Sequence, residues 1–290
     1  MGAPDDISGV VSSYVQLVRR VLTAPDVAPC IISETFPAHD PSRPCALLFS
    51  PHPDDECLTG ALALRLAREQ GWQVVNVAIT LGSDATRRAL RKAELARACA
   101  VLGFDCMLPA PEGFSNVTAE TRAKDAKAWA AMVARCADII ARCKPQAVFL
   151  PHEKDAHPAH VGTHVLAADA LAAQGAGFEC AVFETEYWQP NETPNYMVGV
   201  GEEDVATLLS ALSCPAGENA RNPFDARFPA YLIDNVRRGA ERVGCPGASA
   251  PAMDFAVLYR YGVWKNGRFM PSALGRAVGA DEPLRAICDT

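Results

Sequence analysis

The sequence predicts an α/β protein, a three-layer Rossmann-like sandwich with a mainly parallel central sheet and an active site at the C-terminal ends of the strands. Short apolar runs alternate along the chain with longer segments whose apolar residues recur at helical spacing. Runs that are apolar at nearly every position are typical of strands buried on both faces. Right-handed crossovers between parallel strands gather the loops that follow them at one sheet edge, where such folds bind ligands.

The individual elements follow from these patterns in chain order. Residues 46–50 form an apolar run that ends at Pro51, and the spacing over residues 57–68 predicts a helix that Gly71 closes. The same criteria predict strand 74–80, helix 86–102, strand 106–109, an amphipathic helical stretch over 119–143, strand 147–150, helix 165–173 and strand 179–187.

The chain divides into three parts. Residues 1–44 are an N-terminal helical extension, whose single amphipathic helix we interpret as a cover for the core or as a contact in a homo-oligomer. Residues 45–190 are expected to form the α/β core. Residues 191–290 show an irregular pattern and are expected to pack on the same domain, with the apolar run 255–259 returning to the core.

Composition excludes several classes of function. The 290 residues carry a net charge of −7 and no Lys/Arg cluster, which argues against nucleic acid as a partner. No apolar run approaches the roughly 20 residues of a membrane span, and the chain start lacks the pattern of a signal peptide. The eleven cysteines form no C-x-x-C pair, which indicates reduced, buried thiols in a cytoplasmic protein.

The first motif follows the first predicted core strand and reads Pro51-His52-Pro53-Asp54-Asp55-Glu56. Acids at the start of a helix can cap free N–H groups and favour the helix dipole. A metal site explains the histidine and the adjacent carboxylates better, with His52 and Asp55 as ligands and Asp54 free as a base. Both interpretations remain open at this point.

The second motif follows the strand predicted at 147–150 and contains four histidines between positions 152 and 164. If a helix starts at Pro158, then His157, His160 and His164 lie on one face. His160 is the first candidate for a metal ligand. Two histidines and one carboxylate leave an open position, as in catalytic Zn²⁺ sites, and the same donors also suit Fe²⁺, Mn²⁺ or Co²⁺.

The two motifs resemble those of one enzyme family. Residues 51–56 resemble the His-Pro-Asp-Asp-Glu signature of the PIG-L/LmbE-like N-acetylglucosaminyl deacetylases, and His157-Pro158-Ala159-His160 resembles their His-Pro-Asp-His motif. The order and separation of the motifs match, and residues 91–94 are similar to the Arg-x-x-Glu helix of the family. The resemblance spans residues 45–190.

The resemblance implies a role for each matching residue. His52, Asp55 and His160 would be the metal ligands, Asp54 the general base, and His157 the residue that protonates the leaving amine. Arg91 would bind the substrate. The implied reaction is deacetylation of a small N-acetylated amino sugar or glycoconjugate, by attack of a metal-activated water on the amide carbon.

The chain also departs from the family pattern. Ala159 replaces the second Asp of the His-Pro-Asp-His motif, so His157 lacks that orienting partner, and Asp155 and Glu186 are the candidates to replace it. Residues 81–84 lack the basic residue that often occurs there. These departures leave open which sugar is bound.

The motifs of other enzyme classes are missing from the sequence. A nucleotide-binding Gly-rich turn and a G-x-S-x-G nucleophile elbow are both missing, and Cys57 is expected to pack in the core. Two alternatives stay open: a related zinc amidase that cleaves a larger amide or thiol conjugate, and a non-catalytic sugar-binding descendant of the enzyme.

Overall fold

The structure of the chain is a computed structural model that describes residues 7–33, 40, 42–244, 247, 249–273 and 275–284. Its helical elements are α1 (Ile7–Val18), α2 (Asp55–Leu58), α3 (Ala61–Gln70), η1 (Ala85–Arg87), α4 (Arg88–Leu102), α5 (Ala119–Lys124), α6 (Ala126–Cys143), α7 (Pro158–Ala172), α8 (Glu202–Leu212), α9 (Ala216–Asn219), α10 (Phe224–Gly239) and η2 (Ala240–Gly244). Its strands are β1 (Ile32–Ser33), β2 (Cys45–Ser50), β3 (Gln73–Ala78), β4 (Asp105–Met107), β5 (Ala147–Pro151), β6 (Cys180–Thr185), β7 (Tyr196–Gly199), β8 (Ala256–Lys265), β9 (Arg268–Pro271) and β10 (Arg276–Val278).

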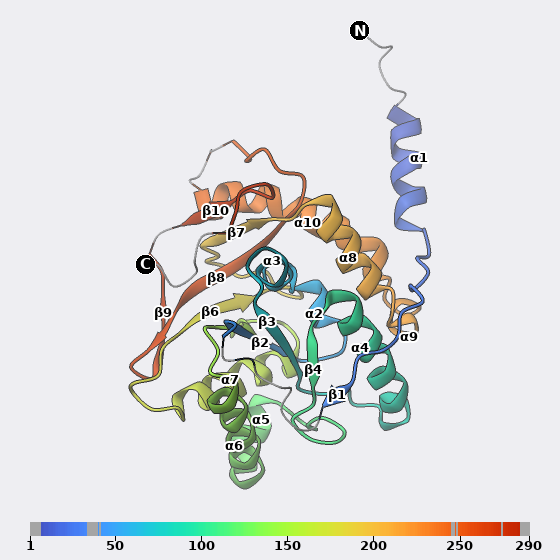
Figure 1. Ribbon diagram of the computed structural model, residues 1–290. Helices are drawn as coiled ribbons and strands as arrows, with labels where there is room; N and C mark the ends of the chain where they lie inside the picture. Colours follow the sequence, from blue (N-terminus) through green and yellow to red (C-terminus); the bar gives the residue numbers. More distant parts are fainter. Residues whose placement is uncertain are drawn as a thin grey trace.

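The strands form one sheet in the order β1-β4-β3-β2-β5-β6-β8-β7-β10, with β9 paired to β8 (Figure 1). From β1 to β6 every neighbouring pair is parallel. The strand β8 pairs antiparallel with β6, β7 and β9, which adds a mixed edge to the parallel core. The predicted mainly parallel α/β sheet is therefore confirmed, and all five predicted core strands are present.

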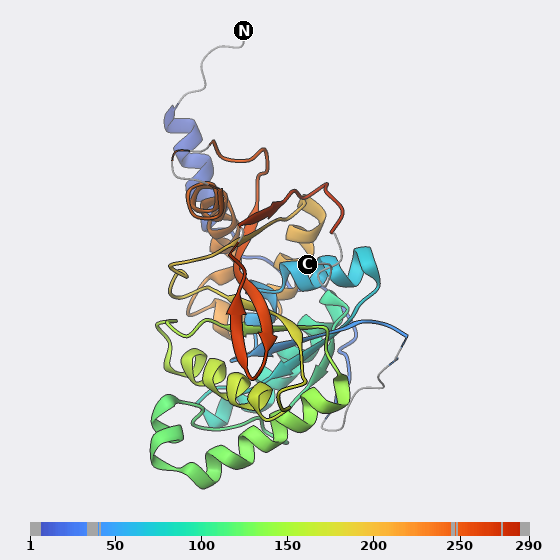
Figure 2. The same cartoon turned by 90° about the vertical axis from the view of Figure 1, so that its left-hand side faces the viewer.

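Helices cover both faces of the sheet, which gives the predicted three layers (Figures 1 and 2). The alternation along β2 shows the division: Leu48 packs among residues of α3, α4 and α8, whereas Leu47 and Phe49 pack among residues of α6 and α7. All three side chains are at most 2% exposed. Burial of each such side chain contributes about 1.5–3 kcal/mol, so the central strand is fixed from both faces.

The sheet has its topological switch point between β2 and β5. The chain leaves β2 toward β3 on one side, whereas β5 and β6 extend the sheet on the other side. In parallel sheets, the loops that follow the two strands at such a point diverge and leave a crevice at their carboxyl ends. The first motif follows β2 and the second follows β5, so the fold brings the two motifs to this crevice.

The structure corrects some of the predicted boundaries. The helix predicted over 57–68 is two helices, α2 and α3, because the chain kinks at Gly60, where a Cβ would lie 2.1 Å from the carbonyl oxygen of Glu56. The stretch 119–143 is divided at Asp125, whose side chain caps α6 by accepting a hydrogen bond from Ala128 N. Polar capping thus interrupts a continuous apolar pattern.

The C-terminal part is more regular than the sequence pattern suggests. Helices α8 and α10 bury an apolar stripe against the core, although Pro229 lies inside α10. The apolar run 255–259 returns to the sheet as part of β8, as predicted.

The N-terminal helix α1 does not cover the core. None of its residues is buried, and Figures 1 and 2 show it extending away from the sheet. The expectation of a covering helix is therefore wrong, and the oligomer contact stays a prediction. Among the described residues, no helix has the length and apolar character needed to cross a membrane.

Candidate metal centre and pocket

The first motif forms a tight turn at the end of β2. The carbonyl oxygen of Pro51 accepts hydrogen bonds from the backbone N of Thr80 (3.1 Å) and from its hydroxyl (2.8 Å), which anchors the turn to the chain beyond β3. The carboxylate of Asp55 accepts a hydrogen bond from the backbone N of His52 at 2.9 Å. This side chain-to-backbone bond holds His52 and Asp55 side by side before any ligand is bound.

Asp54 has a strained backbone within this turn. Its φ of 115° lies in a region that residues other than glycine rarely adopt. Its backbone N donates a hydrogen bond to Glu56 Oε2 at 3.0 Å, and its side chain is buried. Strain of this kind persists only where the surroundings enforce it, and it concentrates at functional sites. The turn directs the carboxylate of Asp54 into the pocket described below.

The second motif places its histidines at the start of α7. His157 is the N-cap residue, with extended backbone angles, and its Nδ1 accepts a hydrogen bond from the backbone N of Ala159 at 3.2 Å. An accepting Nδ1 puts the proton of the neutral ring on Nε2. His160 lies in the first turn of α7 and is 4% exposed. Pro158 at the first helical position pre-orders this start.

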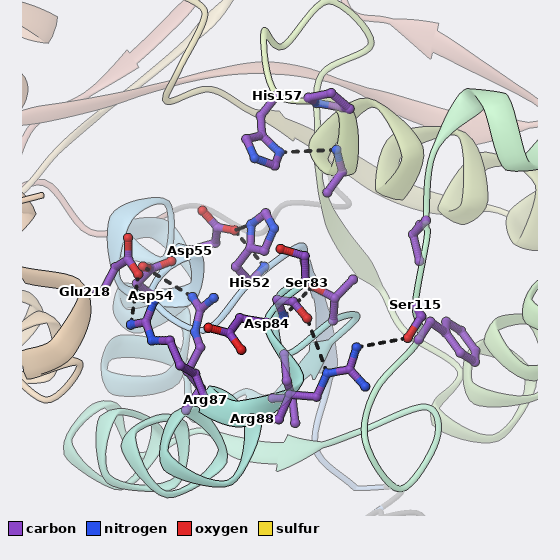
Figure 3. A pocket seen from close by; sticks show the side chains of 18 of the residues that line it. His52, Asp54, Asp55, Ser83, Asp84, Arg87, Arg88, Ser115, His157 and Glu218 are labelled. Carbon is purple, nitrogen blue, oxygen red and sulfur yellow. Dashed lines mark hydrogen bonds and ion pairs between the residues drawn. The ribbon is translucent and has the colours of Figure 1, made fainter. Parts of the chain in front are cut away.

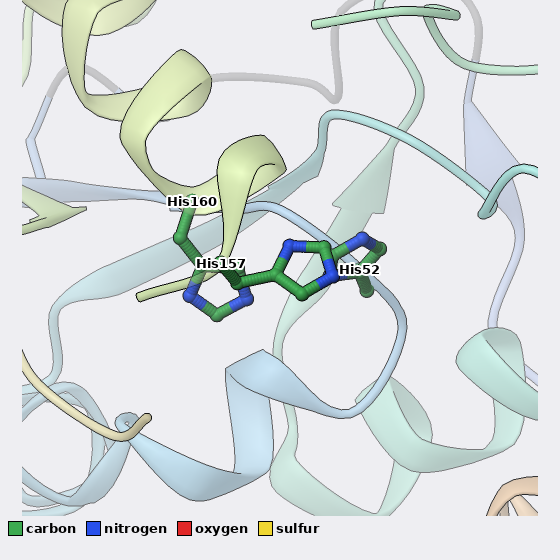
Figure 4. Close-up of side chains that lie close together, drawn as sticks. All are labelled: His52, His157 and His160. Atoms are coloured by element: carbon green, nitrogen blue, oxygen red, sulfur yellow. The ribbon is translucent and has the colours of Figure 1, made fainter. Parts of the chain in front are cut away.

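The two motifs meet in one cluster (Figure 4). Asp55 Oδ2 lies 3.5 Å from His52 Nδ1 and 3.4 Å from His160 Nε2. Each of His52, His157 and His160 offers a nitrogen, and these nitrogens lie within 4.8 Å of one another. The structure therefore brings together all of the residues that the sequence assigned to metal binding, and it places the predicted acid His157 beside them.

The residues fit a bound metal ion. His160 Nε2 is buried and has no hydrogen-bond partner among the described residues, although it faces the carboxylate of Asp55. A buried polar atom without a partner costs free energy, which a metal ion at this position would recover. Two imidazole nitrogens and one carboxylate are also the donor set of catalytic zinc sites.

Asp155 supports the cluster from behind. Its Oδ1 lies 3.6 Å from His160 Nδ1 and accepts a hydrogen bond from the backbone N of His157 at 2.9 Å. A carboxylate behind the second nitrogen of a ligating histidine fixes the ring and makes it a stronger donor. Asp155 thus orients the ring of His160, whereas the ring of His157 is held by the backbone of Ala159.

The second candidate for orienting His157 has a different role. The carboxylate of Glu186 pairs with Arg238 of α10 and accepts a hydrogen bond from the backbone N of Asn191. The expectation that Asp155 or Glu186 replaces the family Asp as a partner of the His157 ring is therefore wrong. Asp155 orients His160 instead, and Glu186 attaches α10 to the end of β6.

Adjacent carboxylates of the first motif differ in their pKa. Burial and the charge of Asp55 raise the pKa of Asp54 well above its usual range, against the opposing effect of Arg91. Burial also raises the pKa of Asp55, but the charges of His160 and His52 outweigh it and lower that pKa to about 2. Paired acids whose pKa values are driven apart have divided roles, one staying charged and one exchanging a proton.

The histidines of the cluster also influence one another. Burial and the neighbouring His52 and His160 lower the pKa of His157. Burial lowers the pKa of His160, but the charges of Asp55 and Asp155 outweigh this and raise it.

Two histidines of the second motif are structural. His152 is 3% exposed, its Nε2 bonds to the carbonyl oxygen of Gln189 at 2.7 Å, and its Nδ1 accepts from Lys154 N. His164 Nδ1 bonds to the carbonyl oxygen of Pro151 at 2.8 Å. The prediction that His164 shares a functional face with His157 and His160 is wrong, because the ring of His164 bonds to Pro151 and lines a different cavity.

Arg91 contacts the first motif directly. Its Nη2 donates a hydrogen bond to the carbonyl oxygen of Pro53 at 3.1 Å and lies 3.9 Å from Asp54 Oδ2. Gly82 makes room for it, since a Cβ there would lie 2.5 Å from Arg91 Nη1. Arg91 therefore supports the turn that carries Asp54 and also lines the pocket. Its predicted contact with a substrate stays a prediction.

The cluster lies at one end of a pocket of about 550 Å³ (Figure 3). The residues that line the pocket away from the cluster share no sequence motif; they include Arg87, Arg88, Ser115, Trp188, Glu218, Arg221 and Phe224. Sequence reasoning missed them because they come from helix ends, a short helix and loops that are far apart in the chain. Glu94 connects that segment to α4, since its Oε1 accepts a hydrogen bond from the backbone N of Gly217 at 3.4 Å.

Comparison with known proteins identifies relatives of this fold. Residues 47–171 match the model of the family described as GlcNAc-PI de-N-acetylase, PIG-L. This segment includes both motifs, so the resemblance inferred from the sequence is confirmed there. A search among curated proteins gave no match.

Solved structures match over most of the chain. The N,N'-diacetylchitobiose deacetylase of Pyrococcus horikoshii is 15% identical, with a TM-score of 0.51 over 92% of this chain and 96% of the other. The deacetylase of the A40926 pseudoaglycone is 18% identical, with a TM-score of 0.53 over 78% and 99%. The 4-carboxy-2-hydroxymuconate hydratase of Pseudomonas putida is 19% identical, with a TM-score of 0.57 over 75% and 95%. At these identities the likeness establishes the fold alone.

Proposed function

Because residues 47–171 match the model of the GlcNAc-PI de-N-acetylase family, we propose that the chain is a metal-dependent hydrolase that removes the acetyl group from an N-acetylated amino sugar. One observation carries this proposal. The carboxylate of Asp54 lies in the pocket beside His52 and Asp55, and His160 Nε2 lies 3.4 Å from Asp55, so the proposed base and the proposed metal ligands are neighbours.

The donor set determines what a bound metal ion would contribute. His52, Asp55 and His160 would hold the ion, with zinc as the default and Fe²⁺, Mn²⁺ or Co²⁺ as alternatives. When bound, such an ion polarises an amide carbonyl and lowers the pKa of water. Asp155 would keep the ring of His160 in the orientation that this binding requires.

Asp54 would accept the proton of the attacking water. Its raised pKa suits this role, because a base with a pKa closer to neutrality holds the proton more strongly than an ordinary carboxylate. Burial excludes bulk water from its carboxylate, and the strained turn fixes the direction of that carboxylate. Arg91, 3.9 Å away, limits the cost of the ionised form.

His157 would donate a proton to the departing nitrogen. An amine leaves an amide only when it is protonated, since the amide anion is too basic. The backbone N of Ala159 donates to Nδ1 of His157, so Nε2 faces the cluster; the acid would be the imidazolium, which forms when Nδ1 takes up a proton in place of this hydrogen bond. The ring centroid of His157 lies 4.9 Å from that of His52, which places the acid next to one of the proposed ligands.

The pocket wall supports a sugar as the substrate. Trp188 is 46% exposed and lines the pocket, with its ring centroid 5.5 Å from that of Phe224. An indole exposed to this degree offers an apolar face on which the C–H groups of a sugar ring can pack. The deacetylases of diacetylchitobiose and of the A40926 pseudoaglycone share this fold, which is consistent with such a substrate.

Two other functions remain alternatives to this proposal. A related amidase that acts on a larger amide or thiol conjugate would use the same cluster. A non-catalytic sugar-binding protein would keep the pocket without turnover. The buried Asp54 favours an enzyme, because a binding protein gains nothing from a strained, desolvated carboxylate. The hydratase among the similar folds shows that the fold alone does not determine the reaction.

The proposal is tested by amine release from a panel of N-acetylated amino sugars, measured with zinc-loaded protein. Free amine and acetate in equal amounts from at least one member would support it. A parallel panel with longer N-acyl chains separates the deacetylase from the broader amidase. Binding of sugars without any release of amine would favour the non-catalytic alternative and contradict the proposal.

A further inference from the structure

One arginine of the pocket lacks an acidic partner. Arg88 is half-buried and lines the pocket. Its Nε donates to the carbonyl oxygen of Gly82 at 3.4 Å, and its Nη2 donates to Ser115 Oγ at 3.2 Å. Both acceptors are neutral, so the charge of Arg88 is not compensated by any ion pair within the described residues.

The other arginines of the pocket are paired. Arg87 Nη2 lies 3.4 Å and Arg221 Nη2 lies 2.8 Å from the carboxylate of Glu218. Arg91 lies beside Asp54. Each of these guanidinium groups therefore faces a charge of opposite sign, and Arg88 differs from all of them.

The nearest acid of the same loop is used elsewhere. Asp84 Oδ1 accepts hydrogen bonds from the backbone N of Thr86 at 2.9 Å and from its hydroxyl at 2.6 Å. These bonds make Asp84 the cap of η1, and they lower the pKa of its carboxyl. The structure thus commits Asp84 to the turn and leaves Arg88 as a charged donor facing the pocket.

From this arrangement we infer that the substrate carries an anionic group, a phosphate or a carboxylate, and that Arg88 binds it together with Ser115. The inference rests on the proposed function, and it specifies the class of sugar. Guanidinium groups bind phosphate and carboxylate oxygens through paired hydrogen bonds, and Nη1 of Arg88 has no acceptor among the described residues. A half-buried charge also costs desolvation energy, which an anionic ligand offsets.

The anionic group would lie away from the amide that is cleaved. Figure 3 shows Arg88 and Ser115 apart from His52 and His157, across the pocket from the proposed metal site. With the acetamido group at the cluster, a different substituent of the sugar would reach Arg88. The hydroxyl of Ser115 adds a neutral donor for a second oxygen of the anion.

The test compares ligands that differ only in the anionic group. The neutral reference is the methyl glycoside of N-acetylglucosamine. The anionic ligands are N-acetylglucosamine 1-phosphate, N-acetylglucosamine 6-phosphate and the carboxymethyl glycoside of N-acetylglucosamine. Phosphate and carboxylate are thus measured in separate arms. Dissociation constants are measured by calorimetry with zinc-loaded protein, and amine release is followed in parallel.

Arg88→Gln removes the charge and keeps the length, and Arg88→Lys keeps the charge without the paired donors. Arg237→Gln removes an arginine from the exposed side of α10, where Arg237 pairs with Asp234. This control measures how far the change in overall charge alone alters the binding of anions. We expect at least one anionic ligand to bind the wild type about 10- to 100-fold more tightly than the neutral reference, as charge-assisted hydrogen bonds predict. Arg88→Gln should lose this preference, Arg88→Lys should keep part of it, and Arg237→Gln should keep it.

Each other outcome is decisive. Equal binding of neutral and anionic ligands by the wild type would overturn the inference, while amine release would still uphold the deacetylase. A preference for anions that persists in Arg88→Gln would place the anion elsewhere, for example on the metal ion, and would also overturn it. A preference that depends on Arg88, without any release of amine, would uphold the anion site and contradict the proposed reaction.

Discussion

Asp155 Oδ1 lies 3.6 Å from Nδ1 of His160, on the side of the ring away from Asp55. The carboxylate beside the ring of His160 therefore comes from a residue that precedes the His157–His160 motif, in which position 159 is alanine. This contact leads to the first prediction.

Asp155→Asn should weaken zinc binding about 10- to 100-fold, because a neutral amide neither polarises the ring of His160 nor holds it as firmly. The dissociation constant is measured by competition with a chelator. Glu153→Gln, an exposed change in the same loop, is the matched control and should bind zinc as the wild type does. Equal affinity in both variants would show that Asp155 has no part in the metal site.

Asp54→Asn should retain zinc and lose turnover by roughly 10²- to 10⁴-fold, the range that general base catalysis contributes. Asparagine tolerates positive φ, so the strained turn should survive the change. Zinc content and amine release are measured on the same preparation. An unchanged rate would exclude Asp54 as the base.

Trp188→Ala should raise KM by about 3- to 10-fold with a smaller effect on kcat, since loss of a packed aromatic face costs about 0.5–1.5 kcal/mol. Trp188→Phe keeps an aromatic face and should stay close to the wild type. Steady-state rates with the best substrate of the panel distinguish the two variants. If Trp188→Ala lowers kcat alone, the sugar does not pack on this ring.

Glu184 should make the stability of the fold depend on pH. Burial raises the pKa of Glu184 to about 7, against the nearby charge of Arg260. Because the unfolded chain releases this proton near pH 4.5, the folded state holds it over a range in which the unfolded state does not. Stability from this group is therefore present at acidic pH and is lost as the pH rises toward 7.

Glu184→Gln imitates the protonated form at every pH. Its free energy of unfolding relative to the wild type should therefore increase between pH 5 and pH 8, by up to about 3 kcal/mol. Glu120→Gln, on the exposed side of α5, should show a constant difference over the same range. Urea unfolding at several pH values provides the measurement, and a flat difference for Glu184→Gln would contradict the expected burial effect.

The sequence predicts best what depends on local structure. His52, Asp55 and His160 were identifiable because each follows a strand end or starts a helix, and parallel topology then brings the two loops together. The proposed role of Asp54 follows from its position beside a proposed ligand. These features need only the strand positions, which apolar patterns show, and the right-handed crossovers of a parallel sheet.

The pocket wall could not be predicted in the same way. Trp188 and Phe224 are far apart in sequence, and their contact depends on how α10 packs against the end of β6, through Glu186 and Arg238. Arg88 lacks an acidic partner because the carboxylate of Asp84 accepts its hydrogen bonds from Thr86. No periodicity in the sequence predicts this side-chain orientation. His164 has helical spacing from His160, but its ring bonds to the carbonyl oxygen of Pro151, which residue spacing does not show.

The central claim is that His52, Asp55 and His160 hold a metal ion that the reaction requires, and the most direct test combines metal content with amine release. The wild type, His160→Ala and His164→Gln are purified in parallel, and both quantities are measured on each. His164 lies one turn further along α7, and its Nδ1 bonds to Pro151 instead of facing the cluster. We predict near-stoichiometric zinc and turnover in the wild type and in His164→Gln, and loss of both in His160→Ala. Metal and turnover that persist in His160→Ala would contradict the account.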